Sequence, residues 1–276
     1  MATIAVTGVT GRLGGRIARR LEAAGVPQRL LVRDLGRAPR LANAEAVVAD
    51  YSDAAAAISA LAGVRTLLMS AAETPQRVAQ HRIFVQAAAD AGVEHLVYIS
   101  FFGAAPTATF TLARDHWDTE QHIKASGMAY TFLRDNVYAD LFRYLAGDDG
   151  ALRGPAGQGR VAGVAQDDIA DVAAVVLQSP HDHPGATYDL TGTQALTLGE
   201  VADILTRVTG RAVTYALETV EEAYASRRAS SDSQWQLDAW VSTYTAIAAG
   251  ELDGVTSHVA DLTGHPATSL EDLLRH

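Results

Sequence analysis

The first fourteen residues constrain the fold of this chain more strongly than any other segment. The apolar run from Thr3 to Thr7 predicts a short strand, which leads directly into Gly8-Val9-Thr10-Gly11-Arg12-Leu13-Gly14 and the start of a helix. In such a turn the first glycine permits the tight bend, the second lets the backbone approach a pyrophosphate, and the third allows close packing of the helix on the strand. The free amides and the dipole at the helix N-terminus attract phosphate.

The turn therefore predicts a dinucleotide site, with a glycine-rich turn that binds no ligand as the alternative. A second β-rich run, 29–33, follows at the distance that a βαβ unit requires, which makes the motif more specific than its glycines alone. The candidate cofactor-binding residues of the turn are Gly8, Thr10, Gly11, Arg12, Leu13 and Gly14.

Short β-rich runs and longer helical patterns alternate through the first half of the chain, which is typical of βαβ units and a parallel sheet. The expected strands are 3–7, 29–33, 46–49, 66–70, 95–100 and 130–133, and the expected helices are 14–24, 54–61, 76–91 and 113–126. We expect an α/β protein with a Rossmann doubly wound parallel sheet and a smaller C-terminal α+β lobe. The expected domains are a Rossmann domain over 1–150 and a substrate or lid lobe over 151–276, interleaved at an approximate boundary.

The second half of the chain is less regular. The glycine-rich segment 150–163 predicts a loop or a hairpin at the edge of the cofactor cleft. The segment 168–178 predicts a helix that Asp167 or Asp168 can cap, because a carboxylate there satisfies free amides of the first turn.

The end of the second expected strand decides which dinucleotide fits. An acidic residue there holds the ribose hydroxyls of NAD, whereas arginine accommodates the 2′-phosphate of NADP. This strand ends at Arg33 and Asp34, Arg12 lies in the glycine turn, and Arg37 and Arg40 follow. On a chain of net charge −10 this basic cluster favours NADP(H). The alternatives are surface ion pairs of the arginines and a ribose contact from Asp34.

The ends of the third and fourth expected strands supply further candidates for cofactor contacts. Asp50 ends the third strand, where it contacts adenine or caps the following turn. Ser70 and Ala71 end the fourth strand, and we expect them to pass near the adenosine or nicotinamide ribose through backbone contacts.

Several segments resemble the atypical short-chain dehydrogenase/reductases, and among them the NmrA-like group that includes NAD(P)H:quinone oxidoreductases and triphenylmethane-dye reductases. Besides the glycine spacing, the strand end Val32-Arg33-Asp34 carries the resemblance. The stretch Ser126-Gly127-Met128-Ala129-Tyr130-Thr131-Phe132-Leu133-Arg134 is similar to the SG-hydrophobic-x-YT-x-LR pattern of that group. The segments 168–173 and 188–192 are similar to its later landmarks. The resemblance implies a Rossmann-type reductase that uses NADP(H).

The same resemblance points to missing catalytic residues. Ordinary members of the superfamily use a Ser or Thr, a Tyr, and a Lys four residues after the Tyr as a proton relay. Counting back from Glu120 places His116 at the Lys position and Leu112 at the Tyr position, and Phe101 and Phe102 occupy the serine positions. A ketone or alcohol dehydrogenase is therefore disfavoured. The resemblance implies direct hydride transfer from NADPH to a quinone or similar electrophilic aromatic, where positioning matters more than a strong acid.

Five residues are the candidates for chemistry and substrate binding. His116 is the catalytic candidate: we expect it to contact the nicotinamide ribose and to deliver a proton near neutral pH. The alternative is a histidine that only forms a local hydrogen bond. Phe101 and Phe102 follow the fifth strand, where we expect them to stack on a flat substrate; the alternative is packing in the core. Asn136 and Tyr138 follow the sixth strand and line the same cleft or form loop hydrogen bonds.

Composition limits the partners and the location. The acidic balance disfavours nucleic-acid and anionic-membrane binding, and the absence of cysteine excludes disulfides and thiolate metal sites. Scattered histidines do not predict a metal site. No apolar run approaches the ~20 residues of a membrane span, and no signal peptide is recognisable. We expect a cytoplasmic protein with a small-molecule substrate and a possible homodimer.

Two other functions stay open at this point. A non-catalytic NADP-sensing regulatory protein that binds a protein partner is the main alternative, because the proton relay is missing. An isomerase or lyase that keeps NADP as a fixed cofactor is the third, and the lack of an evident acid–base pair counts against it.

Overall fold

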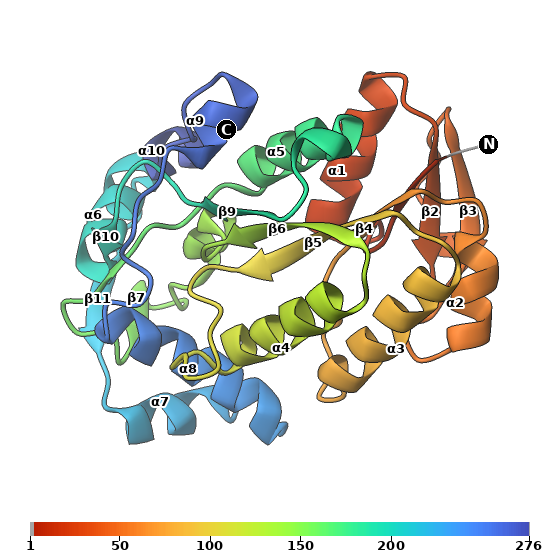
Figure 1. Cartoon of the computed structure of the whole chain (residues 1–276). Coiled ribbons are helices and arrows are strands. Elements are labelled where there is room, and N and C mark those ends of the chain that lie inside the picture. Colours follow the sequence, from red (N-terminus) through yellow and green to blue (C-terminus); the bar gives the residue numbers. More distant parts are fainter. Residues whose placement is uncertain (1–2, 276) are drawn as a thin grey trace. The chain divides into compact units, whose positions relative to one another are not determined.

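A seven-stranded sheet forms the centre of the computed structural model, which describes residues 3–275 (Figure 1). Its order is β3-β2-β1-β4-β5-β6-β9, and β1 pairs in parallel with both β2 and β4. The strands are β1 (Ile4–Val6), β2 (Gln28–Val32), β3 (Ala44–Val48), β4 (Thr66–Met69), β5 (His95–Phe101), β6 (Ala129–Asp135) and β9 (Ala186–Leu190). The reversal of strand order beside β1 is the switch point at which ligands bind in doubly wound sheets, so the predicted fold class is confirmed.

Helices cover both faces of this sheet (Figure 1). They are α1 (Arg12–Ala23), α2 (Ala54–Leu61), α3 (Arg77–Asp90), α4 (Thr111–Ala125) and α5 (Gln166–Gln178). On one face, α2, α3 and α4 bury a cluster that includes Phe84, Ile123 and Phe132, none of which is exposed to solvent. Fully burying such side chains contributes about 1.5–3 kcal/mol each. This cluster holds the strands whose ends carry the candidate site.

On the other face, α1 packs against α5 through ion pairs. Arg16 and Arg20 of α1 both reach Asp167, and Arg20 also pairs with Asp171. Asp167 and Asp168 lie inside the first turn of α5, which begins at Gln166. The helix thus begins two residues earlier than predicted, so both carboxylates lie within its first turn rather than before it, and Asp167 pairs with α1.

The chain folds into two compact units, each built from three segments. The first comprises the residues up to Phe101, Asp115–Arg134 and Gln166–Tyr188. The second comprises Phe102–Arg114, Asp135–Ala165 and the residues from Asp189 onward. The glycine turn lies in the first unit, while the residues that follow β5 and β6 belong to the second.

In the second unit the glycine-rich segment is neither a loop nor a hairpin. Its strands pair with later parts of the chain: β7 (Ala151–Gly154) runs parallel to β11 (Thr214–Leu217), and β8 (Arg160–Val161) is antiparallel to β10 (Leu196–Thr197). The helices of this unit are α6 (Leu198–Thr209), α7 (Val220–Arg227), α8 (Gln234–Ala248), α9 (His258–Thr263) and α10 (Leu270–Arg275). Within residues 3–275, no helix is long and apolar enough to cross a membrane.

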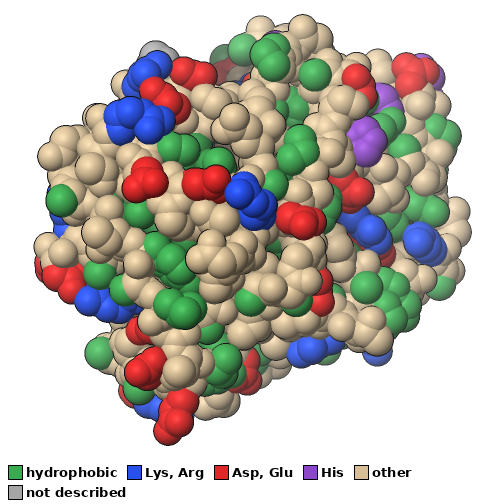
Figure 2. All heavy atoms as spheres, turned by 90° about the vertical axis from the view of Figure 1, so that its left-hand side faces the viewer, with side chains coloured by type: hydrophobic (Ala, Val, Ile, Leu, Met, Phe, Trp, Pro, Cys, Tyr) green, Lys and Arg blue, Asp and Glu red, His purple; other side chains and the backbone are tan. Residues whose placement is uncertain are grey.

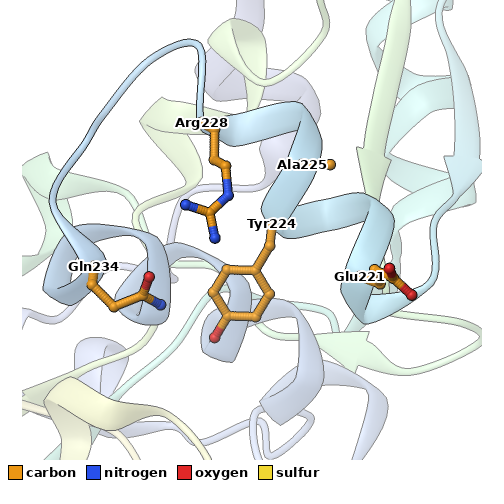
Figure 3. A pocket seen from close by; sticks show the side chains of 5 residues that line it. All are labelled: Glu221, Tyr224, Ala225, Arg228 and Gln234. Atoms are coloured by element: carbon orange, nitrogen blue, oxygen red, sulfur yellow. The ribbon is translucent and has the colours of Figure 1, made fainter.

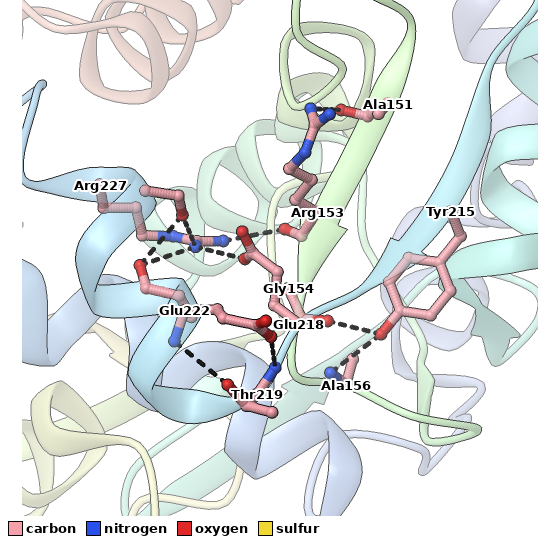
Figure 4. Close-up of polar contacts among 11 residues, drawn as sticks. Ala151, Arg153, Gly154, Ala156, Tyr215, Glu218, Thr219, Glu222 and Arg227 are labelled. Atoms are coloured by element: carbon pink, nitrogen blue, oxygen red, sulfur yellow. Dashed lines mark hydrogen bonds and ion pairs between the residues drawn. The ribbon is translucent and has the colours of Figure 1, made fainter.

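Arg227 ties several elements of the second unit together (Figure 4). Its guanidinium donates hydrogen bonds to Glu218 at 2.9 Å and to the carbonyl of Arg153 at 2.8 Å, and it lies 4.7 Å from the centre of the Tyr244 ring. The same ring fills the space beside Gly154, where a Cβ would come within 2.3 Å of it. This contact fixes α7 and α8 against β7.

Candidate functional site

The glycine turn has the geometry that its spacing predicts. Gly8 has a φ of +68°, which is the left-handed region, and its carbonyl accepts a hydrogen bond from the Gly11 amide at 2.9 Å. A Cβ on Gly14 would lie 2.3 Å from the Gly8 oxygen and 3.0 Å from the Thr7 oxygen. The helix therefore approaches the strand as closely as two backbones allow, and a side chain at Gly14 has no room.

The N-terminus of α1 suits an anionic ligand. Gly11 is the N-cap and has no side chain to satisfy the first amides, and within residues 3–275 no side-chain hydrogen bond caps this end. The first turn contains no acidic residue, and Arg12, its first residue, is exposed. Free amides, the positive end of the dipole and an arginine thus meet at one place, which is the arrangement that binds phosphate.

Thr7, Tyr51 and Ser70 join the ends of β1 and β4 beside the turn. The Tyr51 hydroxyl lies 2.7 Å from both Thr7 Oγ1 and the Ser70 carbonyl, and the Ser70 amide donates to Thr7 Oγ1 at 2.9 Å. Burial raises the pKa of Tyr51 to about 12, so its hydroxyl keeps its proton. The Ser70 side chain lies against Gly8, where a Cβ would come 2.3 Å from its Oγ. We did not predict Thr7 and Tyr51, although Tyr51 directly follows Asp50.

Arg33 and Asp34 differ in how their side chains are engaged. Asp34 caps a short 3-10 helix, Leu35–Arg37, by accepting a hydrogen bond from the Gly36 amide at 2.8 Å. Arg33 is exposed at the end of β2, and its charge acts on Asp50 and Tyr51. The acidic residue is thus used locally, while Arg33 directly follows the carboxyl end of β2, and this combination favours a 2′-phosphate over a bare ribose.

Asp50 follows β3 and bonds within its own turn. Its Oδ1 accepts from the amide and hydroxyl of Ser52, and its carbonyl accepts from the Asp53 amide. These bonds from Ser52, with a smaller contribution from Arg33, lower the pKa of Asp50. The turn-capping alternative is therefore present in the structure, and an adenine contact stays a prediction. Ala71, beyond the end of β4, is half-buried, and its cofactor contact likewise stays a prediction.

His116 lies in α4 with both ring nitrogens engaged. Arg77 donates to Nε2 at 2.9 Å, so Nε2 carries no hydrogen, and the Nδ1 hydrogen points to the Tyr98 hydroxyl at 3.0 Å. Burial first, and then the charge of Arg77, hold the pKa of His116 well below its usual value. The ring is neutral near pH 7, so delivery of a proton near neutral pH does not fit this geometry. A cofactor contact of His116 stays a prediction.

A second buried histidine, His81, holds the segment that follows β4. Its Nε2 accepts from the Ala72 amide at 2.8 Å, so its Nδ1 hydrogen is donated to Thr119 Oγ1 at 2.9 Å. Thr119 in turn donates to the carbonyl of Asp115 at 2.9 Å. The backbone beside Ala71 is thereby fixed to α4 through a neutral imidazole.

This contact makes a part of the stability depend on pH. Burial, and to a smaller extent the charge of Arg77, lower the pKa of His81 from 6.5 to about 3. Between pH 6.5 and 3 the unfolded chain binds a proton at His81 that the folded chain does not. The free energy of unfolding therefore falls as the pH falls through this window.

We expect His81→Gln to reduce this loss of stability at low pH, because glutamine offers an acceptor to the Ala72 amide and does not titrate. The fall in unfolding free energy between pH 6.5 and 4.5 should be smaller than in the wild type by about 2 kcal/mol. Urea unfolding at the two pH values measures it. His181→Gln, at a side chain that is 80% exposed, is the matched control. If the unfolding free energy of His81→Gln fell between these two pH values by as much as that of the wild type, the prediction would be contradicted.

The candidate substrate residues have different surroundings. Phe101, the last residue of β5, lies with its ring 6.2 Å from that of His116, whereas Phe102 packs against Gly254, where a Cβ would come within 2.7 Å of its ring. Asn136 is fully buried, and its amide donates to the Leu252 carbonyl at 3.0 Å. The loop hydrogen bond given above as the alternative for Asn136 is thus present, and its substrate contact stays a prediction.

Tyr138 follows β6 in the second unit and is half-buried. It is hydrogen-bonded to Asp135, the last residue of β6. Asp135 is 3% exposed, and burial raises its pKa well above 3.8 against the opposing effect of the Tyr138 bond. We did not predict Asp135 as a site residue, because an acidic residue at a strand end gives no sign of being buried.

A cavity of about 400 Å³ opens on the second unit beside α7 (Figure 3). It is lined by Glu221, Tyr224, Ala225, Arg228 and Gln234. The side chains of Arg228 and Gln234 point toward each other beside the ring of Tyr224. Its volume is that of a small-molecule site, but its lining contains none of the residues predicted to bind substrate.

Acidic and basic side chains adjoin one another on the face shown in Figure 2. In the second unit, Arg160 of β8 pairs with Glu200 of α6 at 3.0 Å, and Arg207 of α6 pairs with Glu271 of α10 at 2.6 Å. Such exposed pairs contribute about 0–1 kcal/mol each. They neutralise charge locally between neighbouring helices and strands.

Comparisons with known proteins give consistent results over the whole chain. A profile of the NmrA-like family matches residues 1–260. Quinone oxidoreductase 2 of Escherichia coli (strain K12) is 35% identical over 283 aligned residues, which cover 99% of this chain and 98% of that protein. Two solved structures are similar over 98–99% of both chains. One is the NADPH-dependent quinone oxidoreductase of Escherichia coli complexed with NADPH (33% identity, TM-score 0.90), and the other is the Citrobacter sp. triphenylmethane reductase complexed with NADP(H) (31%, 0.89).

Proposed function

The chain belongs to the NmrA-like family, and from this premise we propose that it is an NADPH-dependent reductase of quinones or similar electrophilic aromatic compounds. The observation that carries the proposal is the full-length similarity to a quinone oxidoreductase and a triphenylmethane reductase whose structures hold the cofactor. Because these relatives are enzymes, they favour the reductase over the NADP-sensing regulatory protein.

The residues of the first unit fit NADPH. Gly14 lets α1 pack closely on β1, Gly11 as the second glycine of the turn lets a pyrophosphate approach the backbone, and the uncapped end of α1 supplies amides. We expect Arg33, with Arg12, to hold the 2′-phosphate, since both are exposed and Asp34 is engaged in its own turn. When bound, NADPH supplies the hydride.

The substrate needs little acid catalysis in this proposal. A quinone or a cationic dye is already a strong electrophile, so orientation against the nicotinamide supplies much of the rate. Phe101, Phe102 and Tyr138 follow the carboxyl ends of β5 and β6, where ligands bind in open α/β sheets, and aromatic rings there suit a flat substrate. A homodimer and a cytoplasmic location stay predictions.

Oxidation of NADPH, followed at 340 nm with a panel of quinones and triphenylmethane dyes, tests the proposal. We expect turnover by the purified chain without added flavin, and a faster reaction with NADPH than with NADH. Binding of NADPH without turnover of any acceptor would favour the regulatory protein instead.

A further inference from the structure

The carboxyl group of Asp135 is a buried acid that the reaction above does not use. It ends β6 at 3% exposure, and within residues 3–275 its Oδ2 has no hydrogen-bond partner. A charged carboxylate with an unsatisfied oxygen is costly to bury, whereas a protonated one is far less so. Burial accordingly raises the pKa of Asp135 well above its usual value, which favours the protonated acid.

Tyr138 lies in the segment that follows β6 and contacts the Asp135 carboxyl. Its hydroxyl shares a hydrogen bond with the Asp135 carboxyl, and its side chain is only half-buried. The Phe102 amide donates to the Asp135 carbonyl at 2.9 Å, so the acid lies beside one of the candidate substrate residues. A half-buried phenol is thus hydrogen-bonded to a buried carboxyl at the carboxyl end of β6, the edge at which ligands bind in such sheets.

Reduction of a quinone requires a proton as well as a hydride. Hydride adds two electrons and one hydrogen, and the second oxygen gains its hydrogen as a proton to give the hydroquinone. The positions that hold the tyrosine and lysine of the superfamily's relay are Leu112 and His116, and both nitrogens of His116 are engaged. Quinone reduction therefore leaves the source of the proton unassigned.

We propose that Tyr138 donates this proton, with Asp135 as the positioning residue behind it; the proposal rests on the proposed reductase function. The Tyr138 O–H bond breaks as an O–H bond forms on the quinone oxygen. The Asp135 carboxyl then returns its proton to the phenolate and regains one from water. The net reaction consumes one quinone, one NADPH and one proton, and yields hydroquinone and NADP⁺.

Two classes of electron acceptor can distinguish a proton-donating role of Tyr138 from a purely structural one. A triphenylmethane dye is a carbocation, which becomes the neutral leuco dye on gaining a hydride and needs no proton. Tyr138→Phe keeps the ring and removes the hydroxyl, so it should lower the ratio of kcat for quinones to kcat for a cationic dye by about 10- to 100-fold. Asp135→Asn should show the same split to a smaller extent. Tyr144→Phe, at a nearby 64%-exposed tyrosine, is the control and should change neither rate.

A solvent deuterium isotope effect gives a second readout that does not need the dye. It is expected on quinone reduction by the wild type and should shrink in Tyr138→Phe. An equal loss with quinone and dye, or no loss with quinone, would overturn the relay while leaving the reductase function standing. A wild type that reduces neither acceptor would instead refute the reductase function itself, and the relay with it.

Discussion

Replacing Gly14 by alanine is expected to raise the dissociation constant for NADPH at least about 100-fold. The added Cβ would lie 2.3 Å from the Gly8 oxygen and 2.5 Å from its carbonyl carbon, and these are backbone atoms that no rotamer change can move. The start of α1 must therefore move away from β1, which displaces the amides that bind the pyrophosphate. Titration of NADPH fluorescence measures the affinity, and thermal unfolding reports whether the variant is folded.

The matched control is Gly199→Ala in α6. There a Cβ would meet only Thr197 Oγ1, at 3.8 Å, which is an ordinary contact, and alanine is the better helix former. This variant should bind NADPH as the wild type does and unfold at an equal or higher temperature. A folded Gly14→Ala variant with unchanged affinity would show that the turn does not hold the cofactor.

Arg33→Ala is expected to lower the preference for NADPH over NADH by about 10- to 100-fold. A charge-assisted hydrogen bond to a 2′-phosphate is worth about 1.5–3 kcal/mol, and it is absent with NADH. The ratio of kcat/KM for the two cofactors measures this preference, and the loss should appear in the NADPH value alone.

Arg65→Ala serves as the control for Arg33→Ala. Arg65 precedes β4 at the amino edge of the same sheet, where it pairs with Glu94 at 2.7 Å. Its removal should leave the cofactor preference unchanged, although it removes the same charge from the chain. If both variants kept the wild-type preference, the 2′-phosphate would have to be recognised by other residues.

The features that could be predicted from the sequence are those in which neighbours along the chain determine the geometry. The glycine turn is such a case, since Gly8, Gly11 and Gly14 shape the connection between one strand and the helix that directly follows it. The alternation of strands and helices is another, because burial on both faces imposes the pattern locally.

The features that could not be predicted depend on partners far away in the chain. The matched position of His116 suggested a catalytic role, but its protonation state is decided by burial and then by Arg77, 39 residues earlier. Likewise, the pairing of β7 with β11 turns a glycine-rich stretch into a strand. Asp135 gives no local sign that its carboxyl is buried, because only the packing around β6 removes it from water.

Deuterium labelling tests whether hydride passes directly from NADPH to the acceptor. NADPH deuterated at the transferring position of C4 is mixed with the flavin-free protein and a cationic triphenylmethane dye, and the leuco dye is analysed by mass spectrometry. Direct transfer places one deuterium at the central carbon of each leuco dye molecule. A leuco dye that carries solvent hydrogen at that carbon would contradict direct transfer and point to a mediated reduction.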